Sequence, residues 1–391
     1  MSDVVIVGAK RTAIGSFLGQ FTGTPTPTLG SAAIAGALAQ SGLATGQVDE
    51  VIMGCVLPAG LGQAPARQAM RAAGIPDAAG ATTVNKVCGS GMKAVMLAHD
   101  IIKAGSANAV VAGGMESMTN APHLLNGSRT GVRYGSAEFL DHMAYDGLTN
   151  PYDGKAMGIF GDAACAKYGY DRAAIDAFSA ESARRAQAAQ AAGAFAAEIV
   201  PVTVKTRKGE VVIDRDEEPG KIDLNKIPEL RPAFGKDGVL TAASSSKISD
   251  GAAALVVMSA EAAAAAGAKP LARIVAHATH SQAPEWFTTA PVAAVQSVLA
   301  KAGWNVADVD LFEVNEAFAC VAMAPMSDLG IAHEKLNVNG GALALGHPIG
   351  CSGARLLVTL IHALQARGGK RGVASLCIGG GEATAMAIEL A

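Results

Sequence analysis

Two stretches of this 391-residue chain resemble each other, and similar stretches of sequence fold into similar units. Three short motifs recur in the same order, at offsets of 261, 262 and 266 positions. They are Ala39–Leu43 with Ala300–Trp304, Ser90–Lys93 with Ser352–Arg355, and Gly113–Glu116 with Gly379–Glu382. One such match means little in a chain with 46 glycines, but three in order indicate a duplicated unit.

Each copy alternates β-branched segments with helical ones. The first copy predicts strands at Val4–Gly8, Glu50–Gly54 and Ala109–Gly113, and helices at Gly30–Ser41, Ala64–Ala73 and Ser90–Ala104. The second copy repeats the pattern from Leu271 to Ala391. Such alternation predicts crossover units on a largely parallel sheet. We therefore expect a layered α/β body of two pseudo-symmetric halves, with active-site loops where the halves meet.

Charge separates a middle segment from the two copies. Residues 119–249 hold 16 of the 31 Lys and Arg and 17 of the 34 Asp and Glu, which is half of the charge in a third of the chain. This pattern is typical of a solvent-facing insertion. We predict an N-terminal half of residues 1–118 plus 250–270, an inserted loop domain of residues 119–249, and a C-terminal half of residues 271–391.

Several classes of protein are disfavoured by composition. A net charge of −3 argues against nucleic-acid binding, and no apolar run approaches the roughly 18 residues of a membrane span. The start runs into Val4–Val7, a strand pattern rather than a signal peptide. Six cysteines without a C-x-x-C pair predict neither disulfides nor a metal site. We expect a cytoplasmic enzyme, and dinucleotide, Walker and serine-hydrolase motifs are missing from the sequence.

Two loops at equivalent places in the copies carry a thiol and an imidazole. Cys88 precedes glycines and the helix expected from Ser90, where backbone N–H groups and the helix dipole favour a thiolate. A buried cysteine in a turn is the ordinary alternative. His347 lies between Gly346 and Pro348 in the mirrored loop, and histidine is a common base for a thiol.

Two further loops add a second thiol and an amide. Cys377 ends an apolar run and is followed by three glycines, whose N–H groups can stabilise an oxyanion. Asn315 and Glu316 follow a strand expected at Asp310–Val314, although an Asn helix cap explains that loop equally well. Packing roles are expected for the other four cysteines, which are Cys55, Cys165, Cys320 and Cys351.

Together these loops resemble the thiolase family, and the resemblance runs from Val4 to Glu389. The motifs that carry it are Asn85–Gly91, Asn315–Phe318, Gly340–Gly350 and Cys377–Gly381. The resemblance implies a layered αβαβα fold from two βαβαβαββ halves with a loop domain for coenzyme binding and tetramerisation. It also implies a reversible Claisen condensation of two acetyl-CoA to acetoacetyl-CoA and CoA, through an acetyl-cysteine and without a further cofactor.

The same resemblance implies a role for each reactive group. Cys88 is the acylated nucleophile, His347 takes its proton, and Cys377 moves the α-proton of the second acetyl-CoA. His347 and a water held by Asn315 stabilise the enolate. The N–H groups of Cys88 and Gly379 stabilise the tetrahedral intermediate.

Coenzyme contacts and assembly are likewise implied by the resemblance. The contacts fall on Leu148, Met157, Phe234, Ala242, Ser246, Phe287 and Phe318, and the assembly is a homotetramer of tight dimers. The sequence departs from the family pattern around the coenzyme. Ala156 stands where many members have His, Ser244–Lys247 replaces Asn-Ala-Ser-Gly, and an Arg and a Ser are replaced around Pro219 and Lys226.

Three other functions are alternatives to this one. A degradative 3-ketoacyl-CoA thiolase would use the same four groups on longer chains. A ketoacyl synthase would use a histidine where Asn315 stands, and a non-catalytic homologue would have lost reactive groups.

Overall fold

The computed structural model describes residues 3–207 and 209–391, so that residues 1, 2 and 208 of the expected domains lie outside it. The strands are β1 (Val4–Thr12), β2 (Gly15–Ser16), β3 (Glu50–Gly54), β4 (Gly80–Val84), β5 (Ala109–Ser117), β6 (His123–Leu124), β7 (Leu140–Asp141), β8 (Ile199–Val200), β9 (Val202–Thr206), β10 (Gly209–Ile213), β11 (Ser249–Ser259), β12 (Ala272–Ser281), β13 (Leu311–Val314), β14 (Arg371–Ile378) and β15 (Glu382–Leu390). The α-helices are α1 (Thr26–Ser41), α2 (Pro65–Ala72), α3 (Ser90–Lys103), α4 (Met157–Tyr168), α5 (Arg172–Ala191), α6 (Ala260–Ala266), α7 (Ala290–Ala302), α8 (Ala319–Leu329), α9 (Ala342–Leu345) and α10 (Ile349–Arg367). Single turns of 3₁₀-helix lie at Thr45–Gln47, Ser128–Thr130, Pro219–Lys221, Leu224–Glu229, Pro284–Thr289, Val306–Asp308 and His333–Lys335, with a π-helical turn at Met143–Leu148.

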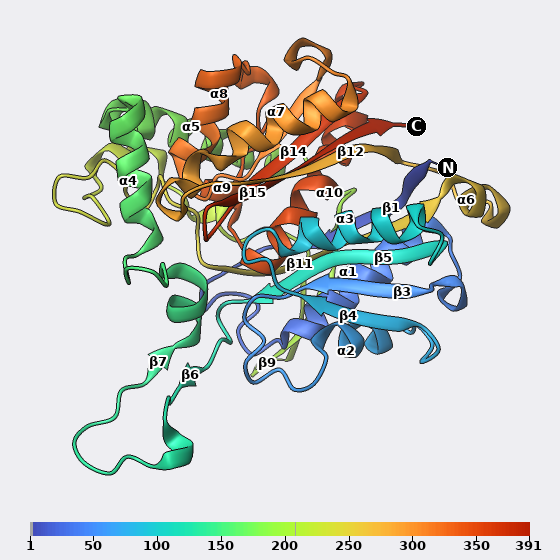
Figure 1. Ribbon diagram of the computed structural model, residues 1–391, viewed down its shortest axis with the longest axis horizontal. Helices are drawn as coiled ribbons and strands as arrows, with labels where there is room; N and C mark the ends of the chain where they lie inside the picture. Colours follow the sequence, from blue (N-terminus) through green and yellow to red (C-terminus); the bar gives the residue numbers. More distant parts are fainter. Residues whose placement is uncertain (1–2, 208) are drawn as a thin grey trace.

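The two halves share one sheet, in the order β13-β14-β15-β12-β1-β11-β5-β3-β4 (Figure 1). The halves join through β1 and β12, which pair at Val5 with Arg273 and at Ile6 with Ala272. In the N-terminal half β3 pairs in parallel with β4 and β5, and the end of β1 pairs in parallel with the short β8, while β11 runs antiparallel to β1, β5 and β2. In the C-terminal half β13 and β14 are parallel, and β15 is antiparallel.

The expectation of a largely parallel sheet is therefore wrong. The sequence alternation revealed strands that helices connect; of these, β3 pairs in parallel with β5 and β13 with β14, whereas β1 runs antiparallel to β11 and β12. The alternation did not reveal β15, which follows β14 after a short glycine turn; a turn of that length can only produce an antiparallel neighbour. It also did not reveal β11, the strand with which the chain re-enters the sheet after the insertion.

Five layers follow from which face of each strand is apolar. Val111 of β5 belongs to a core with α1 and α2, whereas its neighbours Val110 and Ala112 belong to a second core with α3 and α10. This alternation is the period of two expected of a strand buried on both faces. A third core joins α7 and α8 to the outer face of the C-terminal strands. The order is helices, the N-terminal part of the sheet, helices, the C-terminal part of the sheet, and helices, which confirms the αβαβα expectation (Figure 1).

The central helix α10 is long and apolar enough to cross a membrane by length and composition alone. It lies between the two halves of the sheet, and every residue from Ile349 to Leu364 is buried. Its apolar character is explained by this burial, because a helix that packs on all sides needs no polar face.

Structural equivalence corrects one of the three repeat matches. Helices α3 and α10 share the Ser-Gly motif at an offset of 262, and β5 and β14 begin 262 positions apart. Gly113–Glu116, however, lies inside β5, whereas Gly379–Gly381 forms the turn between β14 and β15. The third match is a chance similarity of glycines.

Element boundaries agree with the sequence in part. The strand expected at Glu50–Gly54 is confirmed at both ends, and the helix expected from Ser90 begins there. Helix α1 begins at Thr26, four residues before the expected Gly30, because Pro27 lies in its first turn, where a missing N–H costs nothing. Strand β4 was not predicted, because Gly-Ala-Thr-Thr-Val is not a run of large apolar residues. Its residues are exposed or only partly buried in the structure.

The segment between β5 and β11 contains α4, α5 and two small sheets, β6 with β7 and β9 with β10. The strands β6 and β7 carry a long loop that projects away from the body of the molecule (Figure 1, lower left). Tyr134 and Phe139 on this loop are exposed. The projection leaves apolar side chains without a partner inside the chain.

Candidate active site

Cys88 lies in a strained turn directly before α3. Val87 has a φ of 45°, a left-handed conformation that costs a β-branched residue about 1–3 kcal/mol. The turn is held by two side chains, since Asn85 Oδ1 accepts the Val87 N–H at 2.9 Å and Ser90 Oγ accepts the Lys86 N–H at 2.8 Å. These bonds fix Cys88, which is half-buried, at the mouth of the helix.

The resting Cys88 is a thiol. Burial raises its pKa to about 11, and the N–H groups of Gly379 and of Cys88 itself, which point toward the sulfur, lower it only in part. The backbone N–H groups do favour the thiolate, but desolvation outweighs them. Cys88 consequently needs a base at the moment of reaction.

His347 supplies an unprotonated imidazole. Burial, followed by the positive charge of Arg355, lowers its pKa to about 3. At a pH between about 3 and about 11, Cys88 is therefore a thiol and His347 a neutral imidazole. Gly346, before it, has a φ of 109°, and an added Cβ would meet Ser249 Oγ at 2.2 Å, so only glycine fits there.

Ser352 orients this imidazole and was not expected from the sequence. His347 Nδ1 lies 2.5 Å from Ser352 Oγ, and the Ser352 hydroxyl donates to the Pro348 carbonyl at 3.0 Å. Because the Ser352 hydroxyl donates its only proton to Pro348, its oxygen accepts the Nδ1–H of His347. The other ring nitrogen, Nε2, is then the one that can accept a proton. The signal for this contact was present in the sequence, because Ser352 opens the same helix five residues after His347.

Asn315 contacts the His347 ring rather than capping a helix. Its Nδ2 is 3.4 Å from Nε2 and 3.5 Å from Nδ1, while α8 begins later, at Ala319. Its Oδ1 is buried and has no hydrogen-bond partner among the described residues. Glu316 is structural, since it accepts hydrogen bonds from Ser182, Asn337 and Leu343.

Cys377 is buried at the end of β14, on the face opposite α10. Burial and the neighbouring Cys88 sulfur raise its pKa well above the ordinary value. The two thiols are therefore close enough for the charge of one to affect the other. Gly379, two residues after Cys377, points its N–H toward the Cys88 sulfur, so the β14–β15 turn lies close to both thiols.

Most of the expected coenzyme residues pack in one of two hydrophobic clusters, one beside Cys88 and the other containing Cys377. Leu148 packs against the same small cluster as Cys88. The aromatic side chains and Met157 pack in the core that contains Cys377, with Phe234 and Phe318 edge to face at 5.7 Å. An added methyl at Gly379 would meet Met157 Cε at 3.6 Å.

Phe287 is the most deeply buried of these residues, and its ring lies 6.3 Å from that of Phe160. Ser246 is held by its N–H on the Ala317 carbonyl at 2.9 Å, next to Phe318. Ala242 lies further out, on a cavity of about 270 Å³ that Lys221, Lys226 and Lys247 also line. Thus six of the seven residues lie with the thiols or beside Phe318, and Ala242 lies at a separate opening.

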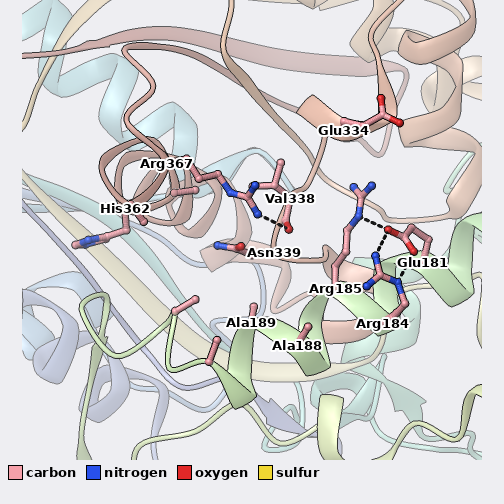
Figure 2. A pocket seen from close by; sticks show the side chains of 14 residues that line it. Glu181, Arg184, Arg185, Ala188, Ala189, Glu334, Val338, Asn339, His362 and Arg367 are labelled. Atoms are coloured by element: carbon pink, nitrogen blue, oxygen red, sulfur yellow. Dashed lines mark hydrogen bonds and ion pairs between the residues drawn. The ribbon is translucent and has the colours of Figure 1, made fainter.

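The other four cysteines, Cys55, Cys165, Cys320 and Cys351, are buried free thiols, which confirms their expected packing roles. A separate cavity of about 680 Å³ lies between α5 and the end of α10 (Figure 2). Its charged lining, with Arg184 and Arg185 paired to Glu181, contains none of the expected site residues.

Comparisons with known proteins agree with this geometry. Residues 4–261 match the family model for the N-terminal domain of thiolase, and residues 268–390 match that for the C-terminal domain. The chain is 51% identical over 389 residues to an acetyl-CoA acetyltransferase of Chromobacterium violaceum, covering 99% of both chains. It is 50% identical over 391 residues to the acetyl-CoA acetyltransferase of Cupriavidus necator, covering 100% of both. A crystal structure of the Bacillus anthracis acetyl-CoA acetyltransferase superimposes with a TM-score of 0.97 at 39% identity, covering 100% of this chain and 99% of that one.

Proposed function

This chain belongs to the thiolase family, and we propose that it catalyses the reversible condensation of two acetyl-CoA molecules to acetoacetyl-CoA and CoA through an acetyl-cysteine. Relatives named acetyl-CoA acetyltransferase, about half identical over the whole chain, support this reaction over degradation of longer 3-ketoacyl chains. Coenzyme A enters and leaves as the acyl carrier, so that the proposed reaction uses no further cofactor.

In the first half-reaction Cys88 attacks the thioester carbonyl of acetyl-CoA. His347 Nε2 takes the thiol proton as the sulfur–carbon bond forms, which suits a neutral imidazole whose Nδ1–H is held by Ser352. The carbonyl–sulfur bond to CoA then breaks, and the CoA sulfur takes the proton from His347. The products are acetyl-Cys88 and CoA, and His347 is neutral again.

In the second half-reaction Cys377 first gives its thiol proton to solvent, and the resulting thiolate removes a proton from the methyl group of a second acetyl-CoA. Acetylation favours that thiolate, because an acetylated Cys88 cannot ionise, and the Cys88 thiolate charge that would raise the pKa of Cys377 can no longer form. The enolate oxygen accepts from a water bound to Asn315 Oδ1 and from His347 in the tautomer that carries its proton on Nε2, in which the Ser352 hydroxyl donates to Nδ1. The buried, unpaired Asn315 Oδ1 supports the place of the water.

The enolate carbon attacks the acetyl carbonyl, and the Cys88–carbon bond breaks to release acetoacetyl-CoA. The departing Cys88 sulfur recovers its proton from Cys377. One observation carries the proposal: the N–H groups of Gly379 and Cys88 both point toward the Cys88 sulfur, beside which the carbonyl oxygen of the tetrahedral intermediate would carry its negative charge.

The proposed activity is tested by incubating the purified protein with acetoacetyl-CoA and CoA and measuring the acetyl-CoA produced. The matched control is Cys351→Ala, which removes a buried thiol of the packing class and should retain activity. Wild-type protein that forms no acetyl-CoA would rule the proposal out.

Substrate length should be limited at the acyl end of the pocket. Met157, Phe287 and Phe318 are bulky and lie in the core that contains Cys377. Overfilling a packed site costs about 1–3 kcal/mol, which corresponds to a roughly 5- to 150-fold loss in kcat/KM. We expect 3-ketohexanoyl-CoA to be cleaved less efficiently than acetoacetyl-CoA by a factor in this range.

The measurement is kcat/KM in the thiolysis direction for a series of 3-ketoacyl-CoA lengths, with Met157→Ala as the variant that enlarges the pocket. Met157→Ala should narrow the difference between the two substrates. Equal or higher kcat/KM for 3-ketohexanoyl-CoA in the wild-type protein would favour the degradative function, with the catalytic groups unchanged.

We also propose a homotetramer, assembled through the projecting loop between β6 and β7. Tyr134 is fully exposed and Phe139 is 66% exposed, and such apolar groups on one loop are typical of a contact surface. Light scattering at micromolar concentration should report about four times the 39.2 kDa chain mass. A double variant, Tyr134→Ser with Phe139→Ser, should report a smaller assembly, whereas Val212→Ser on β10 should not. A wild-type monomer would refute the assembly.

A further inference from the structure

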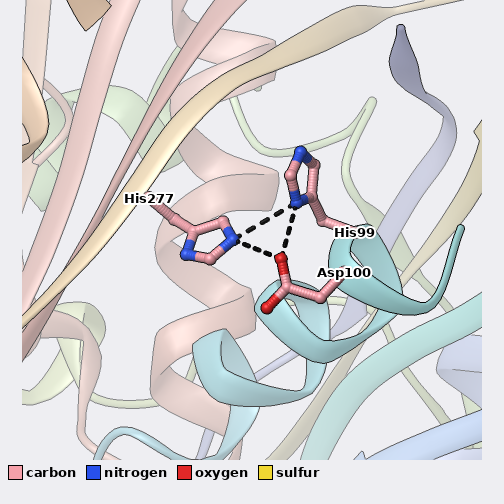
Figure 3. A group of neighbouring side chains, drawn as sticks. All are labelled: His99, Asp100 and His277. Atoms are coloured by element: carbon pink, nitrogen blue, oxygen red, sulfur yellow. Dashed lines mark hydrogen bonds and ion pairs between the residues drawn. The ribbon is translucent and has the colours of Figure 1, made fainter. Parts of the chain in front are cut away.

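Two histidines and an aspartate meet at the contact between the two halves of the molecule, at the opposite end of α3 from Cys88. His99 and Asp100 lie near the end of α3, and His277 lies on β12 (Figure 3). His277 Nε2 is 2.9 Å from Asp100 Oδ1 and 3.2 Å from His99 Nδ1, and His99 Nδ1 is 3.0 Å from the same Asp100 oxygen. Three potential metal-ligand atoms thus form a nearly equilateral triangle.

Hydrogen bonds alone cannot satisfy this triangle. A ring nitrogen either donates or accepts, and the ionised Asp100 oxygen only accepts. If both histidines donate to Asp100, two N–H groups face each other across 3.2 Å. If either histidine accepts instead, its lone pair faces the carboxylate oxygen at 2.9 or 3.0 Å. With Asp100 ionised, one side of the triangle brings like partial charges together in every tautomer of the two histidines, whereas a cation would let all three lone pairs point at one charge.

A β-bulge in β12 turns His277 toward this meeting point. Pairing with β15 shifts between Ile274 and Ala276, so one extra residue enters β12 there. Before the shift Ile274 packs in the central core, and after it Ala278 packs in the outer core. His277 therefore faces α3, which it would not do in a regular strand. Bulges commonly redirect a side chain in this way.

The spacing of the three atoms fits a small divalent ion. With metal–ligand distances of about 2.1 Å, adjacent ligands are about 3.0 Å apart in an octahedron and about 3.4 Å apart in a tetrahedron. The observed separations of 2.9, 3.0 and 3.2 Å match one face of an octahedron, without movement of the chain.

We propose that His99, Asp100 and His277 bind one first-row divalent transition-metal ion, of the class of Zn²⁺ or Co²⁺, between α3 and β12. The His99 and His277 side chains are only 15% and 17% exposed, whereas Asp100 is 52% exposed and leaves the open coordination positions to water. Lys301 is the nearby cation, but its ammonium group is held by the His277 carbonyl at 3.0 Å.

This ion would join the two halves of the molecule. Helix α3 belongs to the N-terminal half and β12 to the C-terminal half, so their shared ion stabilises the contact between halves. The sequence did not predict the site, because 177 positions separate Asp100 from His277 and neither lies in a metal-binding motif.

The test is a Co²⁺ titration of dialysed wild-type protein, followed by calorimetry and by the visible absorption of bound cobalt. We expect one ion per chain, absorption of nitrogen and oxygen ligation, and displacement by Zn²⁺. At an ion concentration about 100 times Kd, Tm should rise by about 3 °C for a chain of this length.

Three variants and two controls make the test specific. His99→Gln and His277→Gln should lose the stoichiometric ion and the Tm rise, and Asp100→Asn should bind at least about tenfold more weakly. The control His280→Gln lies on the same strand but hydrogen-bonds Gln282, and it should bind like wild type. Cys88→Ser should also bind like wild type, which separates this site from the reactive thiols.

Unchanged cobalt binding in His277→Gln would overturn the proposal, as would wild-type protein that takes up no Co²⁺ at about 100 µM, far above the Kd expected of a three-ligand site. Thiolate-to-cobalt charge-transfer absorption in place of nitrogen and oxygen ligation would do the same. The histidine variants without metal should keep the wild-type Tm, because removing either ring also removes the repulsive side of the triangle. A variant that is destabilised without metal would mean that the cluster is a purely structural hydrogen-bond network.

Discussion

Cys377→Ala is expected to abolish condensation while leaving acetyl transfer to Cys88 intact. Loss of a general acid–base group costs about 10²- to 10⁴-fold in rate, and only the second half-reaction moves a proton on carbon. The acylation machinery is independent of Cys377, since it consists of Cys88, His347 and the N–H of Gly379. Removing Cys377 also removes a group whose pKa is coupled to Cys88, without introducing bulk.

The measurement compares acetoacetyl-CoA thiolysis with isotope exchange between acetyl-CoA and labelled CoA. Thiolysis should fall by the factor above, and exchange should stay within about threefold of wild type. Cys320→Ala is the matched control, because Cys320 is a buried thiol in the same core as Cys377. An equal fall in both reactions would show that Cys377 is structural or shared by both steps.

His347→Ala is expected to slow both half-reactions by about 10²- to 10⁴-fold, because the resting Cys88 is a thiol with a pKa of about 11 and His347 is the base proposed to take its proton. Ser352→Ala should have a smaller effect, since it only releases the His347 ring from the orientation that exposes Nε2. Single-turnover acetylation of Cys88 measures the first step directly.

His362→Gln provides the control for loss of a buried imidazole. His362 is buried in α10 and hydrogen-bonds the Ala9 carbonyl at 3.0 Å, outside the site. Its replacement should leave the acetylation rate unchanged. Acetylation of His347→Ala at the wild-type rate would remove His347 from the role of base, and the neutral imidazole would then have to act only on the enolate.

The layered architecture could be predicted from the sequence because duplication is visible in local motifs. Ser90 and Ser352 begin equivalent helices, and those helices form the central layer between the two halves of the sheet. Strand direction could not be predicted in the same way. It depends on whether the chain returns through a helix or a tight turn, and the glycines after Cys377 were interpreted only as an oxyanion loop.

The site could be predicted where reactive groups lie in short motifs at element ends, as Cys88, His347, Asn315 and Cys377 do. Their electrostatics could not be predicted, because the pKa of Cys88 depends on burial by residues far away in sequence. The left-handed Val87 was also missed, since a β-branched residue gives no local sign of strain. His99 and His277 were missed because only the fold, and a bulge within it, brings them together.

The identity of the acylated residue is the most direct test of the proposed chemistry. Wild-type protein incubated with acetyl-CoA, quenched in acid and digested should carry one acetyl group on the peptide that contains Cys88, identified by mass spectrometry. Cys88→Ser should carry no thioester, and Cys377→Ala should still be acetylated on Cys88. Acetyl found on Cys377 while Cys88 remains free would contradict the assignment of the nucleophile and, with it, the proposed order of the two half-reactions.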